Sequence, residues 1–153
     1  MILKWKIFSA DLNPVIGSEQ KGTRPVLIIS DDDYSIAMSL VTILPVTSLK
    51  PGRKTYPNEV LITKQNYEKT GLPHDSIILA HQIRTISKKR LSVLLGSIDD
   101  AEIQEKINDA LRVHLNLWVG IIDSIITATA FYYYNLNWGY SLDFGLHYIW
   151  IKM

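Results

Sequence analysis

The chain has 153 residues, the length of one ordinary domain, which excludes an assembly of several large domains. Apolar residues make up 47% and charged residues 20%, a globular composition that excludes a disordered chain. Sixteen basic residues against 15 acidic ones leave a formal charge of +1, so any site for a polyanion must be local.

Five short β-strands are predicted from apolar runs that end at turn residues. They cover residues 5–11, 25–30, 40–47, 59–63 and 76–82, and the last runs on towards residue 86 after a bend. The run 25–30 is continuously apolar, which is typical of a strand buried on both faces. Pro45 marks a bulge or an edge because proline cannot donate to a ladder.

One helix is predicted after the strands, over residues 99–117. Asp99 and Glu102 have the spacing of a capping box, and Ile103, Ile107, Leu111 and Leu115 recur on one helical face. Several short strands followed by one helix indicate a mainly β protein with some α structure: a small, partly closed antiparallel β-barrel with a C-terminal helix packed across it.

Polar side chains gather at the ends of the predicted strands and in the adjoining loops. They are Ser18, Glu19, Gln20 and Arg24 before the second strand, Thr47 and Ser48 at the end of the third, and His81, Gln82 and Arg84 on the fifth. Strand ends meet at shared loops in a small barrel, so these residues are candidates for one groove. An arginine fork there would match two oxygens of a phosphate.

A basic loop adds to this pattern. Residues 48–57 contain Lys50, Arg53 and Lys54 and no acid, which favours a nucleic-acid backbone. Each residue also has a structural interpretation: Arg24 suits a surface salt bridge, and Thr47 suits a β-branched strand position. On residue type alone, these structural interpretations are favoured.

Other chemistries find no support in the sequence. Without cysteine there are no disulfides, thiolate metal sites or cysteine nucleophiles. The four histidines lack metal-ligand spacing, and neither a P-loop nor a G-x-S-x-G elbow occurs, so we expect no metal and no cofactor. The absence of cysteine fits a reducing compartment and the N-terminus lacks a signal-peptide pattern, so we expect a cytoplasmic protein.

Three ordered motifs resemble those of the MazF/PemK/Kid toxins over roughly residues 3–116. They are the run from Asp11 to Ile28, which contains Gly22-Thr23-Arg24-Pro25; Pro45-Val46-Thr47-Ser48; and Asp75-Ser76 with Gln82-Ile83-Arg84-Thr85-Ile86 and Lys88, Arg90 and Leu91. One such motif would be weak evidence. Three in the same order, covering a whole domain, are specific.

The resemblance implies a small SH3-like antiparallel barrel of the CcdB/PemK type and a homodimer. It also implies the toxin of a type II toxin–antitoxin pair, a metal-independent, sequence-specific endoribonuclease acting on single-stranded RNA. In that chemistry a ribose 2′-OH attacks the adjacent phosphate and leaves a 2′,3′-cyclic phosphate and a 5′-OH. The cognate antitoxin would lay an acidic disordered segment over the same basic groove.

Site residues follow from the motifs they match. The resemblance implies that Arg24 and Thr47 are the main catalytic residues and that Gln82 holds a neighbouring family position. The expected substrate-binding residues are Ser18, Glu19, Gln20, Ser48, Lys50, Arg53, Lys54, Gln82 and Arg84.

His81 is a further catalytic candidate with a structural alternative. Its position carries an acidic residue in the family, and histidine titrates near neutral pH, so His81 suits proton transfer. It equally suits a structural strand position. Kid's arginine two residues earlier is Leu79 here, so Kid's base and acid pair is not carried over. Trp5-Lys6 replaces the common Gly-Asp pair before the first strand, which puts the first turn in question.

A second region begins at residue 117. Residues 1–116 hold 15 Lys and Arg against 13 Asp and Glu, whereas 117–153 hold one Lys, two Asp and 10 of the 15 aromatic residues. We therefore predict a toxin-like domain over 1–116 and an apolar extension over 117–153. The extension has three interpretations: a helix packed on the dimer or antitoxin groove, a membrane contact, or an addition through a lost stop signal. The last is favoured because no amphipathic period or turn signal appears.

Two other functions compete with the nuclease. A gyrase-binding toxin resembling CcdB could use the same barrel, but it would leave the Gly-Thr-Arg-Pro motif without a purpose. A degenerate toxin would be folded and inactive.

Overall fold

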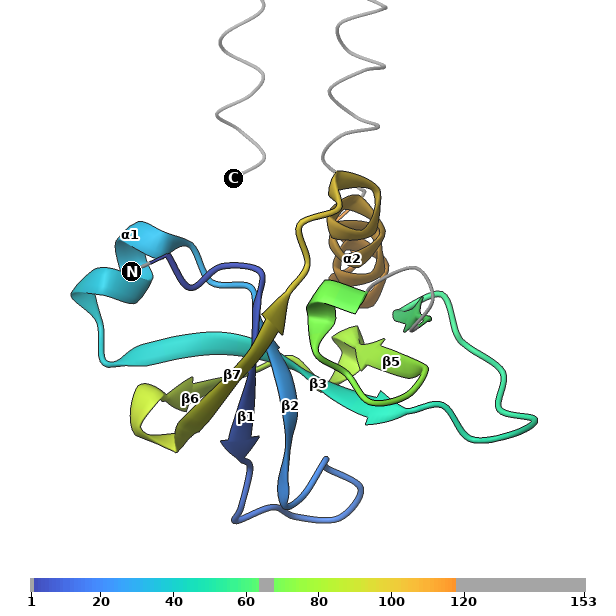
Figure 1. The fold of residues 1–153 in the computed structure, drawn as a ribbon, viewed down its shortest axis with the longest axis horizontal. Helices are drawn as coiled ribbons and strands as arrows, with labels where there is room; N and C mark the ends of the chain where they lie inside the picture. The colour runs from blue at the N-terminus through green and yellow to red at the C-terminus, as the bar shows by residue number, and fades with distance from the viewer. Residues whose placement is uncertain (1, 64–67, 118–153) are drawn as a thin grey trace, which may run out of the picture. The chain divides into compact units, whose positions relative to one another are not determined.

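A computed structural model describes residues 2–63 and 68–117 of the chain (Figure 1). Its described strands are β1 (Lys6–Asp11), β2 (Thr23–Ile28), β3 (Leu40–Ser48), β4 (Glu59–Ile62), β5 (Ser76–Leu79), β6 (Arg84–Ser87) and β7 (Leu91–Ser97). The helices are α1 (Asp32–Ala37) and α2 (Ala101–Leu115), with 3-10 turns η1 (Glu68–Thr70), η2 (Ala80–Gln82) and η3 (Lys88–Arg90). The predicted extension lies almost wholly outside the described residues, and the boundary at 116 stays a prediction.

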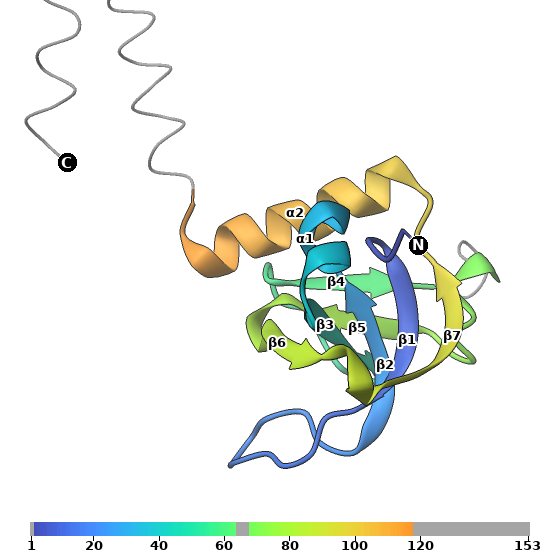
Figure 2. The same ribbon diagram turned by 90° about the vertical axis from the view of Figure 1, so that its left-hand side faces the viewer.

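The strands form a strongly curved antiparallel sheet in the order β4-β5-β3-β2-β1-β7, with β6 also paired to β3 (Figures 1 and 2). This confirms the prediction of a mainly β fold with a C-terminal helix. The long strand β3 is the centre of the sheet, because it pairs with β2, β5 and β6.

Pro45 lies where β3 changes partner. Residues 40–43 of β3 pair with β6, residues 46–48 pair with β5, and Pro45 falls between the two ladders. A residue without an N–H group costs no ladder hydrogen bond in such a gap. The proline therefore lies where β3 passes from pairing with β6 to pairing with β5, at a position where its missing N–H costs no bond to either strand.

Two apolar cores lie on the two faces of the sheet, and alternate residues of each strand enter them. On β2, Val26 and Ile28 enter one core and Leu27 enters the other, and all three have no exposed surface. Residues 26–28 are thus buried on both faces as predicted, whereas residues 25, 29 and 30 of the predicted run are half-buried. Burying each such side chain contributes roughly 1.5–3 kcal/mol, so the register of β2 is firmly fixed.

Helix α2 covers the core that contains Leu27. Its buried residues are Ile103, Ile107 and Ala110. The predicted stripe was wrong at Leu115, which is 47% exposed near the helix end. The cap also differs by one residue, because the Asp100 carboxylate accepts the N–H groups of Glu102 (2.8 Å) and Ile103 (3.2 Å).

The sequence analysis did not predict α1, which begins within the acidic run Asp31-Asp32-Asp33 that follows the second predicted strand. Asp31 caps the helix by accepting the N–H of Asp33 at 3.1 Å. Asp32 accepts the N–H groups of Leu3 (2.6 Å) and Lys4 (3.0 Å), and these bonds hold its pKa below the ordinary 3.8. The run of aspartates therefore ends one strand and also ties the N-terminal segment to the domain.

Strand β7 and turn η2 are two further differences from the sequence prediction. The apolar residues Val93 and Leu94 of β7 are 61% and 52% exposed, so the strand shows no alternating pattern. The predicted fifth strand ends at Leu79, and His81 and Gln82 lie in η2.

Trp5 confirms that the first turn is unusual. Its φ of 65° lies in the left-handed region, where glycine is favoured over a bulky residue. Its ring packs against the core under α2, which compensates for the backbone conformation. Within residues 2–63 and 68–117, no helix combines the length and apolarity needed to span a membrane.

Two glycines provide a matched stability test. Gly71 and Gly52 both have left-handed φ angles, +66° and +75°. A Cβ at Gly52 would meet nothing within 4 Å, whereas one at Gly71 would collide with the backbone carbonyl of Leu95 on β7. We expect Gly52→Ala to lower the free energy of unfolding by about 1–2 kcal/mol, and Gly71→Ala to lower it by a further 1–3 kcal/mol or so. Urea unfolding measures both, and equal losses would contradict the close approach of residue 71 to β7.

Candidate nucleic-acid site

A cavity of about 380 Å³ lies where β2 and β3 meet. It is lined by Arg24 and Pro25 of β2, Val46, Thr47 and Ser48 of β3, and Lys50, Leu72, Pro73 and Ser76. Arg24 and Thr47 each lie two residues beyond Val26 and Pro45, the pair at which the ladder between β2 and β3 ends. The guanidinium-bearing residue and the hydroxyl-bearing residue that the motifs select line the same cavity.

The cavity is electrostatically positive. Its charged lining residues are Arg24 and Lys50, and no carboxylate is among the residues that line it. Arginine donors, a lysine ammonium and the hydroxyls of Thr47 and Ser48 are all groups that can donate hydrogen bonds to phosphate oxygens, whereas the hydroxyl of Ser76 donates to the carbonyl of His74 at 2.8 Å. The lining thus suits a phosphodiester.

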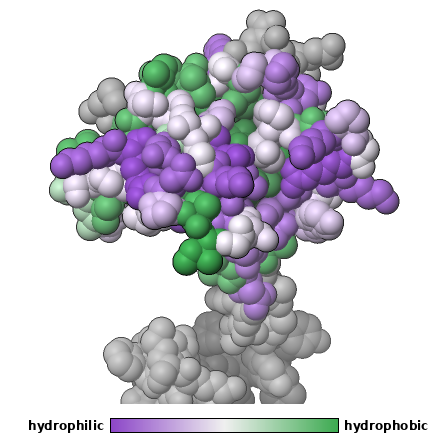
Figure 3. All heavy atoms as spheres, turned by 90° about the horizontal axis from the view of Figure 1, so that it is seen from below, coloured by the Kyte–Doolittle hydropathy of each residue, from purple (hydrophilic) through white to green (hydrophobic). Residues whose placement is uncertain are grey.

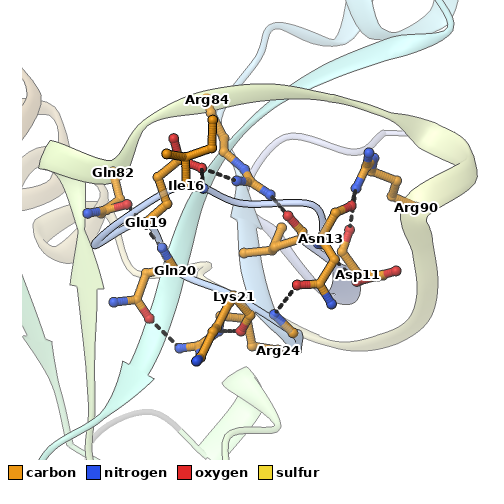
Figure 4. Close-up of polar contacts among 12 residues, drawn as sticks. Asp11, Asn13, Ile16, Glu19, Gln20, Lys21, Arg24, Gln82, Arg84 and Arg90 are labelled. Atoms are coloured by element: carbon orange, nitrogen blue, oxygen red, sulfur yellow. Dashed lines mark hydrogen bonds and ion pairs between the residues drawn. The ribbon is translucent and has the colours of Figure 1, made fainter.

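The side chain of Arg24 is held from the loop that precedes β2 (Figure 4). Its Nε donates to the carbonyl of Lys21 at 2.9 Å, and Nη1 donates to Oε1 of Gln20. The backbone N–H of Gln20 in turn donates to Oε1 of Gln82 at 3.3 Å. Gln82 thus connects η2 to the catalytic candidate through Gln20, and these two predicted residues act on Arg24 and not directly at the cavity wall.

Two further arginines hold the loop of residues 12–22 (Figure 4). Arg84 donates through Nη2 to the carbonyl of Leu12 at 2.6 Å, and its Nη1 lies 3.9 Å from a carboxylate oxygen of Glu19. Arg90 donates through Nη1 to the carbonyls of Asp11 (3.2 Å) and Asn13. Both were cations of the third motif, and the structure gives them bonds to the loop backbone.

The tip of this loop is open to solvent, with Ile16 84% exposed and Ser18 exposed. Glu19 folds back and accepts the N–H of Ile16 at 3.2 Å. The face of the molecule on this side carries mostly hydrophilic side chains (Figure 3). Ser18 and Glu19 therefore lie in the loop and not among the residues that line the cavity.

His81 lies in a different cluster, near α2. Its Nδ1 is 3.8 Å from Oε1 of Glu59, and its ring meets that of His114 edge to face with centroids 6.5 Å apart. Arg53 also binds Glu59, through Nη2 at 2.8 Å. The sequence placed His81 on a strand beside the candidate groove. The structure turns it away in η2, and His81 is not among the residues that line the cavity.

The remaining predicted residues divide between the cavity and the solvent. Ser48 and Lys50 line the cavity, whereas Lys54 is exposed in the loop. Sequence reasoning missed Leu72, Pro73 and Ser76 as lining residues. Ser76 could have been predicted as a lining residue, because Asp75-Ser76 belongs to the third motif.

Other candidate sites are weaker. Over residues 2–63 and 68–117, no group of three or more acidic or histidine side chains could hold a metal ion. A hollow of about 490 Å³ lies between β4 and α2, with Lys106 and Asp109 of opposite charge among its lining residues. It lacks the excess positive charge of the first cavity.

Comparison with known proteins identifies relatives over the domain that carries the cavity. Residues 3–115 match the family model described as PemK-like, MazF-like toxin of type II toxin-antitoxin system. Endoribonuclease EndoA of Bacillus subtilis (strain 168) is 37% identical over 117 residues, which cover 76% of this chain and 97% of that protein.

Solved structures with the same fold include MazF from Deinococcus radiodurans, with a TM-score of 0.61 at 25% identity over 74% of this chain and 94% of that chain. An endoribonuclease from a mycobacterial species, in complex with its cognate antitoxin, has a TM-score of 0.59 at 25% identity. That match covers 75% of this chain and 95% of the mycobacterial one.

Removing the Arg84 side chain tests whether this arginine fixes the conformation of the loop 12–22. Arg84→Ala leaves the carbonyl of Leu12 without its charged donor, and such a bond contributes roughly 1.5–3 kcal/mol. The N–H of Leu12 donates to the carbonyl of Gly22 at 3.1 Å, and the N–H of Gly22 donates to Oδ1 of Asn13 at 3.2 Å. We expect hydrogen exchange at both amides to accelerate about tenfold or more. Lys89→Ala removes an exposed cation nearby and should change neither amide. Unaltered exchange in the Arg84 variant would show that the arginine does not hold the loop.

Proposed function

Because the chain belongs to the PemK-like, MazF-like family of toxins of type II toxin–antitoxin systems, we propose that it cleaves single-stranded RNA at the cavity between β2 and β3. The observation that carries this proposal is the meeting of Arg24, Thr47 and Lys50 in one positively charged cavity. The name of EndoA, an endoribonuclease that is similar over most of this chain, supports the same activity.

The proposed reaction is a transesterification within the RNA. The 2′-oxygen of one ribose forms a bond to the adjacent phosphorus, and the bond from that phosphorus to the 5′-oxygen of the next nucleotide breaks. The products are a 2′,3′-cyclic phosphate and a 5′-OH, with the proton of the 2′-OH passing to a base and another proton reaching the 5′-oxygen.

Arg24 and Thr47 have distinct roles in this proposal. The Arg24 guanidinium stabilises the dianionic phosphorane and suits donation of a proton or hydrogen bond to the departing oxygen. The Thr47 hydroxyl donates to a non-bridging oxygen and orients the phosphate, and Lys50 adds positive charge. We propose that this charge makes a metal ion unnecessary.

The same cavity suits the acidic segment of an antitoxin. A carboxylate-rich chain would neutralise Arg24 and Lys50 and exclude RNA from them. The solved complex of the similar mycobacterial endoribonuclease with its cognate antitoxin supports a partner of this kind. We further propose a homodimer, as the family resemblance implies, and a cytoplasmic location, as the composition and the N-terminal sequence predict.

Replacing Arg24 separates the nuclease from a gyrase-binding or inactive toxin. Arg24→Ala removes the main charge-stabilising donor, which typically costs about 10²–10³ in rate. We expect that loss for cleavage of a defined single-stranded RNA by the purified chain in a metal chelator, with product ends mapped and folding checked by circular dichroism. Lys106→Ala, which removes a cation on α2, is the matched control. Near-normal cleavage by Arg24→Ala would refute the assignment, and inhibition of supercoiling by wild type without RNA cleavage would favour the alternative.

His81 requires a separate test because its catalytic role is a prediction and its position is near Glu59. The cavity residues do not include His81, so we expect His81→Gln to leave the shape of the pH–rate profile between pH 5 and 9, roughly the range in which histidine titrates, unchanged. A profile that loses a limb near neutral pH in this variant would restore His81 as a proton-transfer group.

A further inference from the structure

Glu59, the first residue of β4, is a buried acid whose two hydrogen-bond donors come from one loop, and Nδ1 of His81 lies 3.8 Å from its Oε1. Its side chain is 1% exposed. The guanidinium of Arg53 donates to Oε1 at 2.8 Å, and the backbone N–H of Tyr56 donates to Oε2 at 3.2 Å. A buried carboxylate is tolerated only when it is paired and hydrogen-bonded, and both of its donors belong to the basic loop 48–57.

The same bonds fix the conformation of that loop. The N–H of Glu59 donates to the carbonyl of Tyr56 at 2.9 Å, so residues 56 and 59 bond in both directions. The N–H of Arg53 donates to the carbonyl of Lys50 at 3.1 Å, which closes the turn 50–53. Glu59 therefore anchors the segment 53–56, and Arg53 is the last residue of a turn that Lys50 begins.

Lys50 is the cation that this turn presents to the cavity. It lines the cavity together with Arg24 and Thr47. On the other side its neighbour Leu49 donates its N–H to the carbonyl of Asp75 at 2.7 Å. The backbone of Lys50 is thus held between the Leu49–Asp75 bond and the Arg53–Glu59 pair.

We propose that Glu59 is a positioning residue for substrate binding, which acts through Arg53 to keep Lys50 at the cavity. This inference rests on the proposed ribonuclease function. It assigns Arg53 an indirect role: the loop arginine holds the carboxylate, and Lys50 makes the contact with the RNA phosphate.

A double-mutant cycle tests the proposed route. Lys50→Ala removes a charged contact to phosphate and should raise the KM for a single-stranded RNA about tenfold. Glu59→Gln weakens the hold on Arg53 and should raise KM by a similar factor with little change in kcat. Because both changes act on the same cation, the double variant should have the KM of Lys50→Ala alone. Multiplied effects in the double variant would overturn the proposal.

Matched variants exclude a general loss of stability. Glu102→Gln removes an exposed acid of α2 that pairs with Lys106, and its KM should equal that of wild type. If Glu59→Gln fails to fold, Arg53→Gln breaks the same pair from the loop side. Its effect must likewise vanish in the Lys50→Ala background, and a retained effect there would overturn the proposal.

A measurement without RNA distinguishes this inference from the function on which it rests. Glu59→Gln should accelerate hydrogen exchange at the Arg53 and Tyr56 amides at least tenfold and leave the amides of Leu12 and Gly22 unchanged. Unchanged exchange at 53 and 56 would refute the anchoring role even if wild type cleaves RNA. Absence of cleavage by wild type would refute the proposed function and leave the exchange result standing.

Discussion

The pairing of β2 with β3 is the constraint on which the candidate site depends. Apolar side chains enter the cores on both faces of the sheet at this pair, so neither strand can slip without exposing Val26, Leu27 or Ile43. Arg24 and Thr47 each lie two residues beyond the Val26–Pro45 pair, and both line the cavity. Packing of the apolar side chains next to the cavity therefore restricts the relative position of the two polar groups.

Sequence reasoning succeeded where local pattern and tertiary environment agree. The apolar run 25–30 was recognisable because its centre, residues 26–28, is buried on both faces. The motifs selected Arg24 just before this run and Thr47 near the end of β3, and both line the cavity. It failed for β7, whose exposed Val93 and Leu94 give no alternation, and for α1, where a capping acid resembled a strand break. The prediction that His81 lies on a strand was wrong for a similar reason. A 3-10 turn follows β5, and no glycine or proline in the sequence indicates where the strand ends.

Counting the basic residues of the motifs and loops overestimates how many cations can contact a polyanion at the cavity. Arg84 and Arg90 are bonded to loop carbonyls, and Arg53 is bonded to a buried carboxylate. Each is basic and lies in a motif or loop that suggests contact with RNA, yet each is an internal support in the structure. Arg24 and Lys50 are the cations that line the cavity, and only three-dimensional structure separates these two classes of basic residue.

The loop before β2 has two parts: residues next to the strand that are hydrogen-bonded to Arg24, and a tip that is exposed to solvent. Gln20 and Lys21 immobilise the Arg24 guanidinium before any ligand arrives, so association does not have to freeze a long flexible side chain, a cost of roughly 2 kcal/mol for arginine. The side chains of Ile16 and Ser18 at the tip are exposed and do not bind Arg24. The bonds that hold Arg24 do not involve these tip side chains, so substitutions at the tip can accumulate while the guanidinium stays preorganised.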